Sequence, residues 1–272
     1  MRWQEAVAMY KGNGHYYRSG RKNSQSHNHV YRMLFAAVVV FLVYTHQASA
    51  LSPQINSHAS FDNGNLSSIG SQEHSDLLQL VNGLRAFSRE DYALANRLLT
   101  PLANKGISEA QFYMGMMSDA GLGTKKDVEQ AYLWYQAAAR GGHPNAQHNL
   151  AVAYAQGEGV AVNPDKAIFW WKKAANQGNA DAQYNLGIVY AVGKLGVNKD
   201  MKTAMKWWHK AAQSGDGMAQ YNLGILYANG KGAEKSYCEA TRWWQKSVAN
   251  GVSQAGVALE VLKQRKDYQR CW

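Results

Sequence analysis

The chain has 272 residues, of which 46% are hydrophobic and 11% aromatic, and its formal net charge is +10. This composition excludes an intrinsically disordered chain, and the length fits one elongated array or one to two compact domains. Six of the basic residues precede position 33. The same segment, 1–32, contains one acidic residue, Glu5. Without residues 1–50, 23 basic residues stand against 18 acidic ones, an excess too small to favour nucleic-acid binding.

The first predicted element is a secretory signal peptide. A basic region leads into the apolar run MLFAAVVVFLVY, from Met33 to Tyr44, and then into THQASA, which ends in small residues at Ala50. The apolar run of 12 residues is shorter than the about 20 that a membrane span needs. The sequence therefore predicts cleavage after Ala50 and a periplasmic or secreted protein. The alternative is a protein held in the inner membrane by an uncleaved 33–50 segment.

Residues 51–75 are predicted to form a flexible linker. They are rich in Ser, Asn, Gly and His and contain few apolar residues. The ordered part of the chain is predicted to span 76–264, and 265–272 is a C-terminal tail.

A repeated motif then marks the first helix of each repeat. AQFYMG, AQHNLA, AQYNLG and AQYNLG begin at Ala110, Ala146, Ala182 and Ala219, and a degenerate copy begins at Ala255. Apolar residues in 182–191 recur at i, i+4, i+7 and i+8, which predicts a helix. A glycine stands four residues before each motif. Such a glycine, placed just past the end of the preceding helix, closes its last turn in the left-handed conformation.

The second helix of each repeat carries two adjacent aromatic residues. The first of each pair is Trp134, Trp170, Trp207 or Trp243, at spacings of 36, 37 and 36 residues. Adjacent residues on a helix point about 100° apart, so one apolar stripe needs only one of them. The pair therefore predicts a helix that is apolar on two adjoining faces, one against its own partner helix and one against the next repeat.

The repeats, with their ends, predict the fold class. Residues 76–107 form a degenerate N-terminal copy with Leu98 and Leu99 at the aromatic positions, and a helix over 253–264 closes the array. The chain is thus predicted to be all-α, an α/α superhelical solenoid of about five helix hairpins plus a C-terminal capping helix.

The motifs AQYNLG, GxGV and A..WW..AA..G, at a period near 36, resemble the Sel1-like repeat family, which is related to the tetratricopeptide repeats. The resemblance covers roughly residues 76–262 and is of the bacterial secreted type. It implies a non-catalytic scaffold that binds a partner polypeptide in a concave groove lined by the first helices. The cysteine-rich branch of the family, linked to penicillin-type ligands, has a disulfide in each repeat, and this chain lacks that pattern.

By the same resemblance, the Asn of AQYNLG aligns with a position that hydrogen-bonds the backbone of an extended peptide. The alternative is that these asparagines bond to neighbouring helices and hold the stack together. The aromatic and histidine residues beside them would supply contact area. The predicted partner-binding residues are Phe112, Tyr113, His148, Asn149, Tyr184, Asn185, Tyr221 and Asn222.

The second helices carry many basic residues, which indicate either a solvated face or a site for an anionic partner such as an envelope polysaccharide, a lipid head group or an acidic protein. They are Lys172, Lys173, Lys202, Lys206, Lys210, Arg242 and Lys246. This polymer-binding function is the main alternative to the peptide scaffold.

No catalytic set is predicted. The histidines occupy different repeat positions, and the Gly-x-Gly turns match no phosphate-binding fingerprint, so neither a metal nor a cofactor is expected. A hydrolase acting on peptidoglycan or β-lactams is the third alternative.

The two cysteines, Cys238 and Cys271, are predicted to form a disulfide worth about 2–4 kcal/mol in an oxidising compartment, because antiparallel helices bring their ends together. Two unpaired thiols are the alternative.

Overall fold

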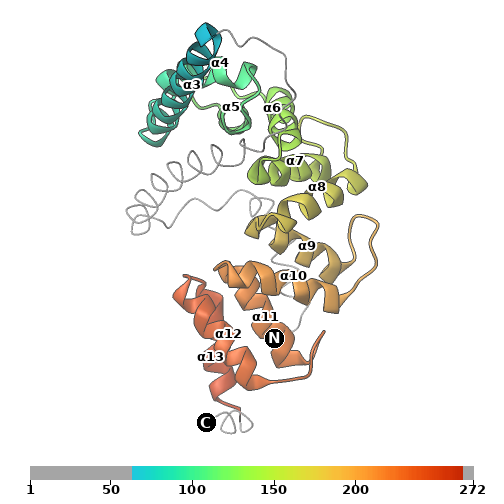
Figure 1. Cartoon of the computed structure of the whole chain (residues 1–272). Helices are drawn as coiled ribbons and strands as arrows, with labels where there is room; N and C mark the ends of the chain where they lie inside the picture. Colours follow the sequence, from blue (N-terminus) through green and yellow to red (C-terminus); the bar gives the residue numbers. More distant parts are fainter. Residues whose placement is uncertain (1–62, 266–272) are drawn as a thin grey trace, which may run out of the picture. The chain divides into compact units, whose positions relative to one another are not determined.

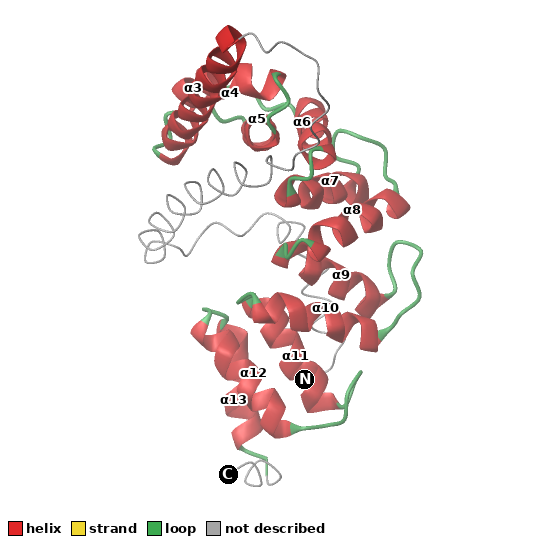
Figure 2. Cartoon of the chain, in the orientation of Figure 1, coloured by secondary structure: helices red, strands yellow, loops and turns green. Residues whose placement is uncertain are grey.

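The computed structural model describes residues 63–265, with side chains from residue 72 onward. This part of the chain contains eleven helices and no strand (Figure 2). The helices are α3 (Asn63–Ser88), α4 (Tyr92–Asn104), α5 (Ser108–Ala120), α6 (Val128–Arg140), α7 (Pro144–Gln156), α8 (Pro164–Asn176), α9 (Ala180–Val192), α10 (Met201–Gln213), α11 (Gly217–Asn229), α12 (Tyr237–Ala249) and α13 (Ser253–Lys263). The predicted signal peptide, 1–50, lies outside the described residues.

The helices follow one another as hairpins, each packed beside the previous one (Figure 1). The second helix α6, for example, packs both on its own first helix α5 and on the next first helix α7, and α8, α10 and α12 repeat this arrangement. The described residues from 68 onward belong to one compact unit. The predicted fold class, a solenoid of five hairpins closed by α13, is confirmed.

Helix α3 begins earlier than the sequence predicts. It starts at Asn63, inside the 51–75 segment for which a flexible linker is predicted, so 63–75 are helical in the structure. Its later turns form the first helix of the N-terminal hairpin, where Ala86, Leu99 and Leu102 share one buried cluster. The polar composition that suggested a linker also suits a helix that is largely exposed, and residues 72–75 are exposed.

Both ends of the helices are fixed by local hydrogen bonds. The side chain of Asn163 accepts a hydrogen bond from the backbone N–H of Lys166, and Pro164 occupies the first position of α8. The glycines that precede each motif have φ values between 83° and 91°, and they are Gly106, Gly142, Gly178, Gly215 and Gly251. This left-handed conformation at the end of each second helix is the one predicted.

The two aromatic residues of each pair have different environments. The second one is buried, with exposed fractions of 2% for Trp171 and 6% for Trp208 and Trp244, whereas the first one is half-buried. The second residue packs against a glycine of its own first helix. A Cβ added to Gly224 would lie only 2.3 Å from Nε1 of Trp244. The glycine is therefore required for the close packing of the two helices.

This packing also places the indole N–H on the backbone of the first helix. Nε1 of Trp244 donates to the carbonyl of Tyr221 at 3.1 Å, and Nε1 of Trp208 donates to the carbonyl of Tyr184 at the same distance. Each acceptor lies three residues before the glycine and so on the same face of the first helix. The indole therefore contacts the glycine and donates to this carbonyl at the same time.

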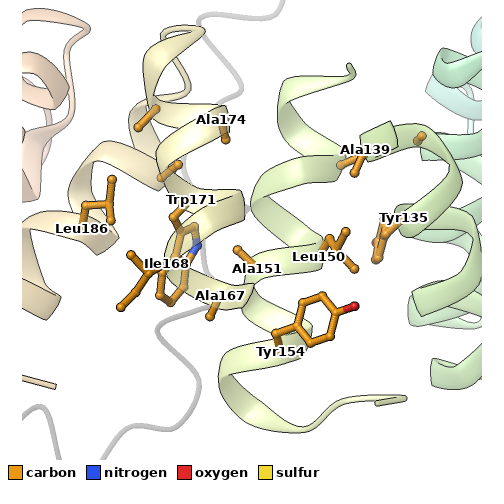
Figure 3. Close-up of a cluster of buried hydrophobic side chains, with 14 of the residues drawn as sticks. Tyr135, Ala139, Leu150, Ala151, Tyr154, Ala167, Ile168, Trp171, Ala174 and Leu186 are labelled. Carbon is orange, nitrogen blue, oxygen red and sulfur yellow. The ribbon is translucent and has the colours of Figure 1, made fainter. Parts of the chain in front are cut away.

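The repeat that starts at Pro144 differs in this respect. Ala151 stands where the other full repeats have glycine, and Figure 3 shows Trp171 of α8 between Ala151 of α7 and Leu186 of α9. The buried Nε1 of Trp171 has no hydrogen-bond partner among the described residues. In the repeat where alanine replaces glycine, the indole N–H thus lacks the hydrogen bond that the two glycine-containing repeats form.

Glutamines join successive repeats. The buried side chain of Gln183 donates to the carbonyl of Ala175, at the C-terminal end of the preceding second helix, at 2.9 Å. Gln111, Gln147 and Gln220 make the same bond to Ala103, Ala139 and Ala212. Each of these carbonyls also accepts the backbone N–H of the glycine that follows the helix, so the glutamine adds a second hydrogen bond that links two repeats.

We predict that Gly224→Ala destabilises the protein although alanine is the better helix former. The added methyl group would displace the indole of Trp244 and leave its buried N–H unpaired, which costs about 1–3 kcal/mol, against a gain of up to about 1 kcal/mol in helix propensity. Chemical denaturation followed by circular dichroism measures the change. Gly256→Ala in α13 is the matched control, because its Cβ would meet only Val248, at 3.8 Å, and should be neutral or stabilising. Equal losses in both variants would contradict this role of Gly224.

We also predict that Ser214→Asn stabilises the third full repeat. Asn250 occupies the corresponding position one repeat later and donates to Oε1 of Gln220 at 2.8 Å, whereas Oε1 of Gln183 lacks a partner among the described residues. An asparagine at 214 would supply the missing donor, for a gain of about 0.5–1.5 kcal/mol. Thermal melting should rank Asn above both Ser and Ala at this position, and an Asn variant no more stable than the Ala variant would refute the assignment.

Candidate functional site

The first helices carry a surface made of two parallel rows of side chains. We call Asn149, Asn185 and Asn222 the amide row, with Tyr113 at the same position in the first full repeat. Three residues further along each helix, and so on the same face, stands an apolar residue. This apolar row consists of Met116, Val152, Ile188 and Ile225. Most of these side chains are half-buried, and Asn185 and Ile188 are 7% and 9% exposed.

The N-terminal ends of neighbouring first helices contact one another. Nε2 of His143, at the N-terminus of α7, lies 3.0 Å from a carboxylate oxygen of Glu109 on α5. One repeat later, the side chain of Asn179 donates to that of Asn145 at 2.8 Å. The N-terminal ends of neighbouring first helices therefore lie close together, and each row recurs once per repeat.

The asparagines of the amide row differ from the glutamines of the same motif in their hydrogen bonds. Within the described residues, the side chains of Asn149, Asn185 and Asn222 form no hydrogen bond, whereas all four glutamines of the same motif bond to the preceding helix. The alternative in which the asparagines maintain the stack thus finds no support in the contacts. An unbonded carboxamide offers both donors and an acceptor to a ligand.

The residues that precede the amide row are less accessible to a partner than the sequence predicts. Phe112 is 8% exposed, lies in the core and stacks on His143 with ring centroids 4.4 Å apart. It supports the stack and is not available as a contact residue. Tyr184 and Tyr221 are half-buried, and burial raises the pKa of the Tyr221 hydroxyl. Tyr113 stays at the surface edge, packed against Phe87 at 4.8 Å.

His148 differs from the aromatic residues at the same position in the other repeats. Its Nδ1 atom is buried and has no hydrogen-bond partner in the described part of the chain. Burial lowers the pKa of His148, and the nearby Asp181 carboxylate opposes this only in part. The ring is therefore neutral at pH 7 and packs as an apolar group.

Sequence reasoning missed the apolar row. Its signal was present, because the third residue after each asparagine position is Met, Val, Ile or Ile in the four repeats. The apolar periodicity predicted for 182–191, at i, i+4, i+7 and i+8, does not include this position.

The remaining chemistry of the described residues is limited. Between 63 and 265, no group of three or more His, Cys, Asp or Glu side chains is arranged to hold a metal ion. None of the described helices combines the length and apolar character that crossing a membrane requires. Cys238 lies at the second position of α12, and Cys271 lies outside the described residues, so their disulfide stays a prediction.

Comparison with known proteins gives consistent results. The Sel1 repeat model matches residues 108–143, 144–179, 180–216 and 217–252. The structure is similar to that of a Sel1 repeat protein from Oxalobacter formigenes, with 31% identity over 66% of this chain and 73% of that one, and a TM-score of 0.63. It is also similar to a protective antigen of uropathogenic Escherichia coli strains with the SLR fold, at 31% identity, 72% and 43% coverage and a TM-score of 0.64. Among curated proteins, none matches this chain.

We predict that His148 makes the fold sensitive to mild acid. Because burial holds its pKa below the ordinary value of 6.5, the unfolded chain takes up a proton first, and stability is lost as the pH falls below about 6.5. His148→Tyr, which introduces the residue found at 184 and 221, should flatten the dependence of the unfolding free energy on pH between 6.5 and 5. Burial also lowers the pKa of His209, so His209→Gln is the comparison variant. A slope that His148→Tyr leaves unchanged would exclude the role of His148.

Proposed function

This chain belongs to the Sel1 repeat family, and from this premise we propose that it is a scaffold of the bacterial cell envelope that binds a partner polypeptide along the amide and apolar rows. Sel1 repeat proteins are in general protein-interaction scaffolds, and their fold is typically non-catalytic. The proposal adds to this a surface, a mode of binding and a location.

The observation that carries the proposal is the contrast between two carboxamides of one motif. In AQYNLG, the glutamine is buried and bonded to the preceding helix, whereas the asparagine two residues later is left without a bond among the described residues. An extended peptide exposes backbone N–H and C=O groups along its length. The amide row can pair with these groups once per repeat, and the apolar row beside it can receive apolar side chains of the same peptide.

The envelope location rests on the predicted signal peptide and on the two cysteines. A cleaved chain in an oxidising compartment could form the predicted Cys238–Cys271 disulfide near the C-terminal end of the array. The similarity to a protective antigen of a pathogen supports an exported location as well.

The double variant Asn185→Ala with Asn222→Ala tests the binding surface. We expect it to fold normally, because neither side chain bonds to another described residue, and to lose polypeptides that the wild type retains from an envelope extract. Mass spectrometry of the retained material compares the two proteins, and melting curves confirm that the fold is intact. A loss of about tenfold in retained partner corresponds to about 1.4 kcal/mol.

A matched control removes two asparagines from elsewhere. Asn104→Ala with Asn198→Ala changes two exposed side chains outside the first-helix surface and should leave the retained polypeptides unchanged. Partner retention that survives the double variant at 185 and 222, or that falls equally in the control, would rule out the amide row as the binding surface.

A further inference from the structure

The second helices hold a row of lysines over tryptophan rings, and we propose that this lysine row binds an acidic polysaccharide independently of the first-helix surface. The row consists of Lys173 on α8, Lys210 on α10 and Lys246 on α12, at the same position in three consecutive repeats. The first full repeat has Ala137 there, so the row begins at α8.

Each lysine of the row lies over the first tryptophan of the aromatic pair, three residues earlier. The Nζ atoms of Lys173, Lys210 and Lys246 are 5.5, 4.7 and 4.6 Å from the ring centroids of Trp170, Trp207 and Trp243. Such cation–π contacts restrict a side chain that is otherwise mobile. The charges are thus held in place before a ligand arrives, which lowers the entropic cost of binding.

Basic side chains outnumber acidic ones on the three helices that carry the row. Lys172, Lys206 and Lys210 are exposed, and none of the lysines of α8, α10 and α12 forms an ion pair with a described residue. On these three helices, within the described residues, the ion pair between Arg242 and Glu239 stands alone. Ordinary surfaces mix both signs, so a stripe of unpaired lysines creates a field that attracts an extended anion.

The half-exposed rings beside the lysines favour a carbohydrate over other anionic polymers. The apolar face of a sugar ring can pack on Trp170, Trp207 or Trp243 while its carboxylate reaches the lysine above the same indole. Phe169, which is 51% exposed and lies 5.1 Å from Nζ of Lys173, extends this aromatic surface on α8. One repeat of the protein thus offers a ring and a charge together, the two features that an acidic sugar presents.

A lipid surface fits the same helices less well. Membrane binding by a protein face requires several large apolar side chains that enter the lipid next to the basic residues. The exposed large apolar residues of these helices in the described part are Phe169 on α8 and Val248 on α12, with none on α10 between them.

Binding to immobilised polygalacturonate, a polymer of carboxylated sugars, tests the proposal. The purified protein should bind it at 0.1 M salt and should not bind dextran, which is neutral. The triple variant Lys173→Gln, Lys210→Gln and Lys246→Gln should bind at least tenfold more weakly. For this variant, the slope of log affinity against log salt concentration should be shallower by about two. The reason is that binding releases about three fewer counterions.

The control must remove the same charge from other places. Arg89→Gln, Lys125→Gln and Lys126→Gln neutralise three exposed basic residues in turns outside the three helices and should change the affinity by less than about twofold. Trp207→Leu keeps all lysines and removes one ring. It should weaken the binding that remains at 0.5 M salt, where screening leaves contact with the rings dominant.

The outcomes separate this proposal from the peptide-binding function. Polygalacturonate binding should survive Asn185→Ala with Asn222→Ala, and the polypeptides retained from envelope extracts should survive the lysine variant. The proposal is overturned if the control variant weakens binding as much as the lysine variant, or if polygalacturonate is not bound. It is likewise overturned if phosphatidylglycerol vesicles or double-stranded DNA bind more tightly than the polysaccharide.

Discussion

The contact between the second aromatic residue and the glycine of the first helix is the interaction on which the rest of the structure depends. Because Gly187 and Gly224 have no Cβ, the indoles of Trp208 and Trp244 lie against the helix backbone and donate to a carbonyl three residues earlier. In these two repeats the hydrogen bond adds to the packing that holds the second helix in one orientation. In that orientation the second aromatic residue is buried and the first is half-buried. Trp171 shows the effect of one added methyl group. Its first helix has Ala151 in place of glycine, and its indole N–H has no partner among the described residues.

The polar groups of each hairpin are divided between folding and recognition. At the end of each second helix, an alanine carbonyl accepts both the backbone N–H of the following glycine and the side chain of the buried glutamine of the next repeat. A second glutamine or asparagine after the helix then pairs with this glutamine, as Gln177 does with Gln147. The asparagine of the motif, in contrast, forms no hydrogen bond with another described residue. A polar residue at a fixed, buried or half-buried position without such a bond is a reasonable place to look for ligand contacts.

The sequence predicted the fold well because the repeat is specified by local chemistry. Glycines with positive φ, capping residues such as Asn163 and the doubled aromatics each have one structural explanation, and four copies remove ambiguity. The site was harder to predict. Periodicity placed Phe112 next to the amide row, but it cannot tell that the ring stacks on His143 of the next repeat and is buried there. Which of two adjacent tryptophans is buried depends on packing against the first helix across the hairpin, a contact between helices that a single helical pattern does not contain. The start of α3 at Asn63 was missed because the polar composition of 63–75 shows no apolar period to detect.

The two proposed surfaces differ in chemistry because they belong to different helices of each hairpin. The amide and apolar rows lie on first helices and carry no charge, whereas the lysine row lies on second helices beside unpaired basic residues. Both kinds of surface repeat once per hairpin, since each occupies fixed positions of the repeat. A substitution on one surface therefore alters neither the glycine contact nor the opposite helix face. This separation allows the same stack to hold a polypeptide on one set of helices and a charged polymer on the other, and each affinity can change without loss of the fold.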